Sequence, residues 1–259
     1  MLRLIALALV LGFCGPALPA PLPDVIDSIR GGIVGVGRAY PPRQPLPRGK
    51  SSMGFAGTGF AVGNGRLVVT NAHVLPEKID EDNKETLAVF SGRGAESQVH
   101  RARVLRVDLD HDLALLEIGP PALPALQLGD SAGVREGQAV AITGFPIGVV
   151  LGLYPVTHRG IVSAITPMAR PADDSGTLSA AQLRRMRNPF DAFQLDAVAY
   201  PGNSGSPVYD QASGRVIGVL NSVLVKESRE SLLQRPSGIS YAIPVKFVKE
   251  LLQAVQSDS

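Results

Sequence analysis

Three residues that could together carry out acyl transfer lie at widely separated points of the chain: His73, Asp112 and Ser204. A serine hydroxyl becomes a nucleophile when a nearby base takes its proton, and a carboxylate orients that base. The order histidine, aspartate, serine is one of the known chain orders of this arrangement. These residues therefore predict a serine hydrolase, provided that the fold brings them together.

Ser204 lies between two glycines in the stretch YPGNSGSP (200–207), which separates an apolar run from a strand-like run. Glycines leave neighbouring backbone N–H groups accessible, as the binding of a developing oxyanion requires. The same composition is also typical of an ordinary turn between two strands. The turn alone does not decide between these interpretations, whereas the matching order of His73 and Asp112 favours the catalytic one.

Other residues compete for the roles of base and acid. His100, His111 and His158 are interpreted as ordinary surface or strand residues. Asp108 and Asp110 are interpreted as carboxylates of a solvated turn. Asp112 is preferred because it directly precedes the apolar run LALLEI (113–118).

Other classes of hydrolase lack their characteristic residues. The Gly-x-Ser-x-Gly motif of α/β-hydrolases needs a glycine at position 206, where the chain has Ser206. The sequence has no HExxH motif and no cluster of cysteine and histidine, so we predict no metal and no cofactor.

Residues 1–20 predict a secretory signal peptide, because the apolar run 4–13 follows a single charge, Arg3, and is too short to span a bilayer. Cleavage after Ala17 and cleavage after Ala20 both fit. We expect an exported protein, in the bacterial periplasm, with secretion or a lipid anchor on Cys14 as alternatives. Since Cys14 is the only cysteine, we expect the mature chain to be stabilised by its core without disulfides.

Charge and hydropathy exclude several kinds of partner. Removal of Arg3 lowers the formal net charge from +2 to +1, which favours neither nucleic acid nor a membrane surface. No second run of about 18 apolar residues occurs, so no membrane span is expected after removal of the signal. The sequence does not determine the oligomeric state.

The composition predicts an all-β protein, a sandwich or a pair of barrels, because 28 glycines and 21 prolines accompany only 5% aromatic residues. GTGFAV (57–62) and RLVVT (66–70) form a predicted hairpin around Asn64-Gly65. Loops are expected at 38–54 and 166–193, and a short helix at 24–30. Further strands are expected at 32–37, 86–90, 99–107, 113–118, 138–143, 157–165, 207–210, 215–223 and 238–243.

The chain divides at a proline-rich segment. Residues 119–124 contain three prolines and lie near the middle of the mature chain. A helix is expected after Pro244, since Val245, Val248, Leu251, Leu252 and Val255 fall on one face. We predict a signal peptide at 1–20, an N-terminal β-barrel at 21–118, a linker at 119–137, a C-terminal β-barrel at 138–243 and a helix with a tail at 244–259.

Six segments together resemble the trypsin-like protease domain of the bacterial HtrA (Deg) family: GTGFAV, TNAHVL, HDLALLEI, GIVSAI, PGNSGS and GISYAIP. They extend from about residue 57, and with the valine-rich helix that follows them the resemblance reaches residue 255. The resemblance implies two six-stranded β-barrels packed around a cleft, and a polypeptide substrate. It also implies that His73 is the general base, Asp112 its orienting acid and Ser204 the nucleophile. The oxyanion hole falls on Gly202, Asn203 and Ser204, with the N–H groups of Gly202 and Ser204 as donors.

The resemblance extends to substrate binding. Val198, six residues before the nucleophile, would form the base of the primary pocket, and its apolar side chain offers no partner to a basic residue. We therefore expect cleavage after small or medium aliphatic residues. Val219, Leu220 and Asn221 would pair with the substrate backbone. In the alternative interpretation, Val198 and Leu220 only fill the barrel core.

Three departures from the family pattern stand out. Ser206 replaces a common second glycine after the nucleophile, and no PDZ region is expected after the final helix. The loop 170–187, which contains four arginines, is longer than the family pattern predicts. Two other functions stay open: a catalytically silent scaffold that keeps the fold, and an esterase that uses the same three residues.

Overall fold

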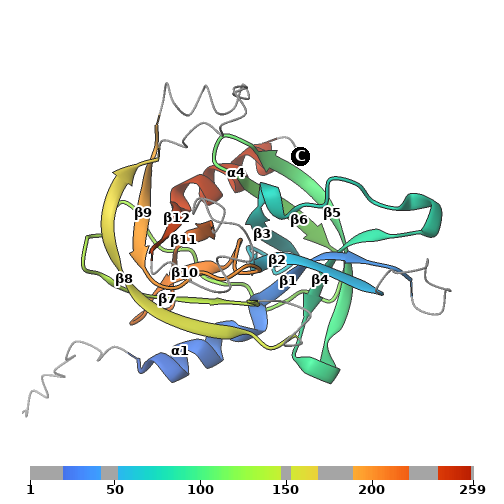
Figure 1. The fold of residues 1–259 in the computed structure, drawn as a ribbon, viewed down its shortest axis with the longest axis horizontal. Helices are drawn as coiled ribbons and strands as arrows, with labels where there is room; N and C mark the ends of the chain where they lie inside the picture. Colours follow the sequence, from blue (N-terminus) through green and yellow to red (C-terminus); the bar gives the residue numbers. More distant parts are fainter. Residues whose placement is uncertain (1–19, 42–51, 147–152, 169–188, 222–238, 258–259) are drawn as a thin grey trace, which may run out of the picture.

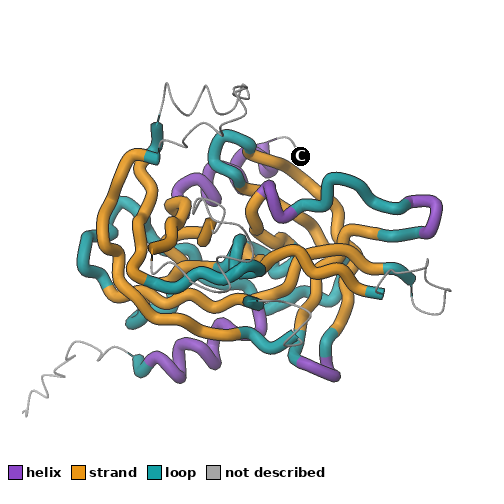
Figure 2. Tube along the Cα trace, in the orientation of Figure 1, coloured by secondary structure: helices purple, strands orange, loops and turns teal. Residues whose placement is uncertain are grey.

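The structure, a computed structural model, describes residues 20–41, 52–146, 153–168, 189–221 and 239–257. It consists of two closed six-stranded barrels, so the predicted pair of barrels is confirmed (Figure 1). The strand order is β1-β2-β3-β6-β5-β4 in the first barrel and β10-β11-β12-β9-β8-β7 in the second. Strands dominate the described residues, and the longer helices α1 and α4 lie outside the barrels (Figure 2).

The strands of the first barrel are β1 Ile33–Ala39, β2 Met53–Val62, β3 Leu67–Asn71, β4 Thr86–Ser91, β5 Gln98–Asp108 and β6 Leu113–Ile118. Those of the second barrel are β7 Ala139–Gly144, β8 Val156–Pro167, β9 Asp191–Asp196, β10 Pro207–Asp210, β11 Val216–Asn221 and β12 Ile239–Pro244. Helix α1 is Leu22–Ile29 and helix α4 is Val245–Ser257.

The predicted hairpin is confirmed. β2 pairs antiparallel with β3 in the register Phe60↔Val69 and Val62↔Leu67. The turn between them needs left-handed backbone at Gly63 and Gly65, whose φ angles are +60° and +78°. Glycine adopts this conformation without a steric penalty, which explains why the turn forms at this point.

The two barrels and helix α4 share one apolar core. α4 contacts β5 and β6 of the first barrel as well as β11 and β12 of the second (Figure 1, red). Burying this surface holds the barrels together, since each large apolar side chain contributes about 1.5–3 kcal/mol. The shared cluster includes Phe60, Leu113, Leu115, Tyr209, Val219, Ile243, Phe247 and Val248.

The expected loop at 166–193 is shorter than predicted. β8 continues to Pro167, and β9 begins at Asp191. The sequence of β9 combines apolar residues with polar ones, among them Asp191 and Gln194. Pairing with β8 on one side and β12 on the other outweighs this weak local preference.

Several predictions fall outside the described residues. These are most of the signal peptide (1–19), the centre of the proline-rich loop (42–51), the arginine-containing segment 169–188 and the end of the expected strand at 215–223. In the described part of the chain, no helix has both the length and the apolar character needed to cross a bilayer.

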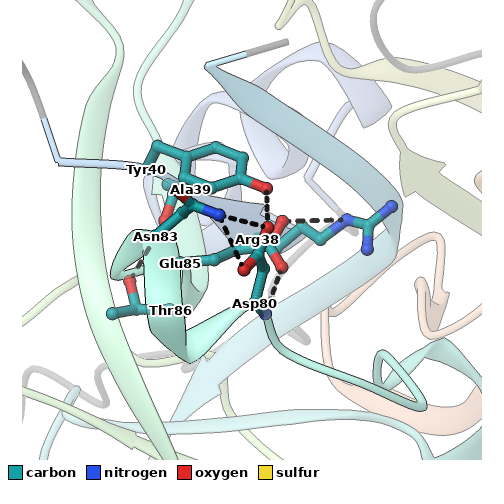
Figure 3. Close-up of polar contacts among 7 residues, drawn as sticks. All are labelled: Arg38, Ala39, Tyr40, Asp80, Asn83, Glu85 and Thr86. Atoms are coloured by element: carbon teal, nitrogen blue, oxygen red, sulfur yellow. Dashed lines mark hydrogen bonds and ion pairs between the residues drawn. The ribbon is translucent and has the colours of Figure 1, made fainter. Parts of the chain in front are cut away.

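A buried carboxylate organises the end of the first barrel (Figure 3). Glu85 is only 4% exposed, accepts the backbone N–H of Asp80 at 2.8 Å and lies 3.4 Å from Nε of Arg38. The hydroxyl of Tyr40 donates to Asp80 at 3.3 Å, and the amide of Asn83 donates to both Asp80 carboxylate oxygens. The cluster therefore fixes the exit of β1 to the segment before β4 while giving each buried oxygen a partner.

A buried histidine should make the stability of the fold sensitive to mild acid. His100 is 8% exposed and bonds Ser91 Oγ at 2.8 Å through Nε2, and burial lowers its pKa. The unfolded chain protonates this residue near its ordinary pKa of about 6.5, whereas the folded protein resists protonation. The unfolded state then binds more protons, so the free energy of unfolding should fall as the pH drops from about 7 to about 5.

Urea unfolding at a series of pH values checks this prediction. His100→Leu should reduce the slope of stability against pH, and the exposed neighbour Val99, changed to Ala, should leave the slope unchanged. An unaltered slope in His100→Leu would show that His100 is not the responsible group.

Candidate active site

His73 and Asp112 meet because of how β3 and β6 pair. Asn71 at the end of β3 lies opposite Leu113 at the start of β6, so the residues just beyond this pair are neighbours. His73 lies in the short 3-10 helix Ala72–Val74. Asp112 has the left-handed φ of +54°, which bends the chain at the entrance of β6. The Ala72 N–H and the Asn71 amide both donate to the backbone carbonyl of Asp112, at 3.1 and 3.0 Å.

The carboxylate of Asp112 receives three hydrogen bonds. Oδ2 lies 2.6 Å from Nδ1 of His73 and accepts from Nδ2 of Asn221 at 2.7 Å. Oδ1 accepts the backbone N–H of His73 at 3.0 Å. Because an ionised carboxylate only accepts, Nδ1 of His73 carries the hydrogen and Nε2 is left as the basic nitrogen.

Asp112 is held in its ionised form. Burial by itself raises the pKa of this carboxyl, but the hydrogen bonds from His73 and Asn221, together with electrostatic attraction to the His73 imidazole, outweigh burial and keep the pKa below its usual value. A permanently charged partner fixes the orientation of the imidazole and stabilises its protonated form.

A second histidine–aspartate pair lies beside the first. Nδ1 of His111 is 2.6 Å from Oδ2 of Asp108, and the His111 ring stacks on Phe247 of α4 at 3.7 Å between ring centroids. The structure thus pairs Asp108 with His111 and Asp112 with His73. No group of three or more histidine, cysteine, aspartate or glutamate side chains suited to a metal ion occurs among the described residues.

Ser204 lies in a tightly bonded turn between β9 and β10 and is 5% exposed. The N–H of Asn203 bonds the Tyr200 carbonyl at 3.0 Å, and that of Ser206 bonds the Asn203 carbonyl at 3.0 Å. Gly205 has φ +85°, and a side chain there would lie 2.0 Å from the Thr58 carbonyl oxygen. Only glycine fits at position 205, because the turn packs directly on strand β2.

Strand β11 connects this turn to Asp112. The N–H of Gly205 bonds the Leu220 carbonyl, and the N–H of Leu220 bonds the Ser206 carbonyl, both at 2.9 Å. The next residue, Asn221, reaches Asp112. A Cβ on Gly57 of β2 would lie 2.9 Å from the Ser204 carbonyl and 2.7 Å from Val74, the neighbour of His73. The structure thus brings all three predicted residues to the junction of the two barrels.

The structure bears on two of the predicted roles. The N–H of Asn203 is bonded to Tyr200 and its side chain is fully buried, which leaves the N–H groups of Gly202 and Ser204 as the expected oxyanion donors. Val219 pairs with Pro207 on one side and Ile243 on the other, and both backbone groups of Leu220 bond the turn. The barrel therefore already uses the backbone groups of Leu220, one of the three residues that were expected to pair with substrate.

Asn221 instead has a role that the sequence did not reveal, as the amide donor to Asp112. The available signal was one polar residue at the end of the apolar strand VIGVLN (216–221). Val198 lies half-buried between the buried Ala197 and Ala199, on the segment that leads from β9 to the turn.

Comparison with known proteins identifies relatives. The trypsin-like peptidase domain matches residues 57–219. Serine protease HTRA1A of Danio rerio is 30% identical over 235 residues, which are 88% of this chain and 40% of that protein. A probable periplasmic serine endoprotease DegP-like of Halomonas elongata is 30% identical over 226 residues, which are 86% of this chain and 40% of that protein. The chain thus spans about 40% of the length of these relatives.

A solved structure shares the fold. The HtrA-type protease AlgW with tripeptide superposes with a TM-score of 0.64 at 24% sequence identity, over 91% of this chain and 64% of that one.

Removal of the Asn221 amide should raise the pKa of Asp112 and destabilise the fold. Asn221→Ala leaves a buried carboxylate oxygen with one donor fewer, which costs about 1–3 kcal/mol. Urea unfolding measures the loss. As a control, Asn64→Ala removes an exposed hydrogen bond, from the Arg66 N–H to Oδ1 of Asn64, and should cost less than about 0.5 kcal/mol. Equal losses in the two variants would contradict the assigned role of Asn221.

Proposed function

Because the chain belongs to the trypsin-like peptidase family, we propose that it is a serine endopeptidase with Ser204 as nucleophile, His73 as general base and Asp112 as the residue that orients His73. One observation carries the proposal: an ionised carboxylate holds Nδ1 of His73 at 2.6 Å, at the same barrel junction as the turn that contains Ser204.

The reaction proceeds through an acyl-enzyme. Nε2 of His73 takes the hydroxyl proton of Ser204 as its oxygen attacks the scissile carbonyl carbon. The tetrahedral intermediate collapses, the C–N bond breaks and His73 gives the proton to the departing amine. Water, deprotonated by His73, then hydrolyses the ester and restores Ser204. Asp112 stays ionised throughout and stabilises the imidazolium.

The N–H groups of Gly202 and Ser204 bind the oxyanion in this proposal. Their orientation is supported by the bonding of the turn around them, where the N–H groups of Asn203 and Ser206 bond carbonyls of the turn and that of Gly205 bonds strand β11. Each donor contributes about 3–4 kcal/mol of transition-state stabilisation.

Polypeptides are the proposed substrates, and the periplasm is the proposed location. The relative from Halomonas elongata is described as a periplasmic serine endoprotease, and the solved AlgW structure contains a tripeptide. A signal peptide at residues 1–20 would direct export.

Val198 forms the base of the primary pocket in this proposal, and cleavage follows small or medium aliphatic residues. Its half-buried position just before the turn supports this assignment. A lysine or arginine in such a pocket would be desolvated without a partner, which disfavours basic residues.

Replacement of the nucleophile should abolish turnover. Ser204→Ala should lower the rate of casein cleavage by at least about 10⁴-fold, because the acyl-enzyme can no longer form. Ser206→Ala is the matched control, since Ser206 lies in the same turn and its buried hydroxyl has no hydrogen-bond partner among the described residues. This variant should keep the wild-type rate.

A folded wild-type protein that cleaves neither casein nor small esters would support a silent scaffold, and cleavage of esters alone would support an esterase. Either result would overturn the endopeptidase proposal.

The fragments from an unfolded protein substrate test the pocket. Mass spectrometry should find most cleavages after valine, alanine, leucine or isoleucine. Val198→Asp should shift cleavage toward lysine and arginine, because the new carboxylate would pair with them, while Val99→Asp on the exposed face of β5 should leave the pattern unchanged. A wild-type preference for basic residues would refute the aliphatic pocket.

A further inference from the structure

We propose that Thr58, on strand β2 of the first barrel, is a positioning residue that fixes the oxyanion-binding turn of the second barrel. The proposal rests on the function proposed above, because it assigns to Thr58 the task of orienting the Gly202–Ser204 backbone. Thr58 is fully buried and contacts this turn across 144 residues of sequence.

Two hydrogen bonds run from Thr58 to the turn. Its backbone N–H donates to the carbonyl of Ser204 at 2.8 Å, and its Oγ1 donates to the carbonyl of Gly202 at 2.8 Å. These two carbonyls belong to the residues before and after Asn203. Thr58 of the first barrel therefore holds the turn on both sides of the peptide bond between Asn203 and Ser204.

The Thr58 hydroxyl both donates and accepts a hydrogen bond. A hydroxyl has one donor and two acceptor positions. Oγ1 gives its hydrogen to Gly202 and accepts the backbone N–H of Phe145 at 3.0 Å. Phe145 directly follows β7, so the hydroxyl joins the turn, β2 and the end of β7 at one point.

Thr58 itself has little freedom to move. Oγ1 of Thr70 donates to the Thr58 carbonyl at 2.7 Å, and the same carbonyl packs against Gly205, where a Cβ would lie only 2.0 Å away. A positioning residue must be held by its own surroundings, and these contacts supply that support.

The bonds constrain the peptide groups of the turn. The peptide between Gly202 and Asn203 is fixed at both ends, because its carbonyl bonds Thr58 and its N–H bonds Tyr200. The peptide between Ser204 and Gly205 is likewise fixed, by Thr58 at the carbonyl and by Leu220 at the N–H. Because these two peptide planes are held, the Gly202 and Ser204 N–H groups have fewer ways to turn away from the reacting carbonyl. Such preorganisation lowers the activation barrier of the reaction.

Isosteric replacement separates positioning from simple stabilisation. Thr58→Val keeps the shape but removes the bonds to Gly202 and Phe145, and should lower kcat about 10- to 100-fold with KM changed by less than about threefold. Thr58→Ser keeps the hydroxyl and should retain kcat within about threefold. Thr143→Val is the matched control, because Thr143 is equally buried and its hydroxyl bonds Thr157 and Tyr209 rather than the turn. It should lose stability but keep kcat.

Hydrogen exchange of the 200–206 peptide gives a readout that does not need turnover. Exchange at Asn203 and Gly205 should be faster in Thr58→Val than in wild type and unchanged in Thr143→Val. If Thr58→Val does not fold, Thr58→Ala replaces it with the same expectations, because alanine also lacks the hydroxyl that bonds Gly202 and Phe145.

The outcomes distinguish the two proposals. An inactive wild type would overturn the proposed endopeptidase while leaving exchange to test the role of Thr58. An active wild type with unchanged kcat and exchange in Thr58→Val would overturn the positioning role, as would an equal loss of kcat in Thr143→Val.

Discussion

This structure depends on the hydrogen bonds that keep the buried carboxylate of Asp112 ionised. Asp112 belongs to the first barrel, yet one of its three donors, Asn221, comes from the second. Leaving such a charge without partners would cost several kcal/mol of folding free energy, so the two barrels have to keep their relative position at the site. The same bonds that keep Asp112 ionised therefore fix the orientation of His73 and the relative position of the barrels at the site.

The remainder of the junction supports this arrangement by packing and by backbone hydrogen bonds. The shared core of β-strands and α4 supplies the stabilising free energy, while Thr58 and Leu220 determine the geometry of the turn that carries Ser204. Function and stability are thus coupled at this junction, because Asp112, Thr58 and Leu220 each bond elements distant in the sequence. In this account the first barrel contributes the base and its acid, and the second contributes the nucleophile.

The sequence predicted those features that have a local signal. Asn64-Gly65 indicated the hairpin, the apolar run after Asp112 indicated β6, and the glycines around Ser204 indicated a tight turn. Features set by tertiary contacts were missed: β9 begins inside a stretch interpreted as a loop, and the side-chain amide of Asn221 bonds Asp112. Asn203 was placed in the oxyanion hole without a stated bonding role, and the structure shows that its N–H bonds Tyr200. No local pattern reveals where a backbone N–H finds its acceptor.

The most direct test of the central claim is to map the covalent adduct of a fluorophosphonate on the folded, mature protein by mass spectrometry. If His73 and Asp112 activate the hydroxyl in the turn, one adduct per chain should form, on Ser204, and its rate of formation should fall sharply in Asp112→Asn. Absence of an adduct, or an adduct on another serine that forms equally fast in Asp112→Asn, would contradict the account.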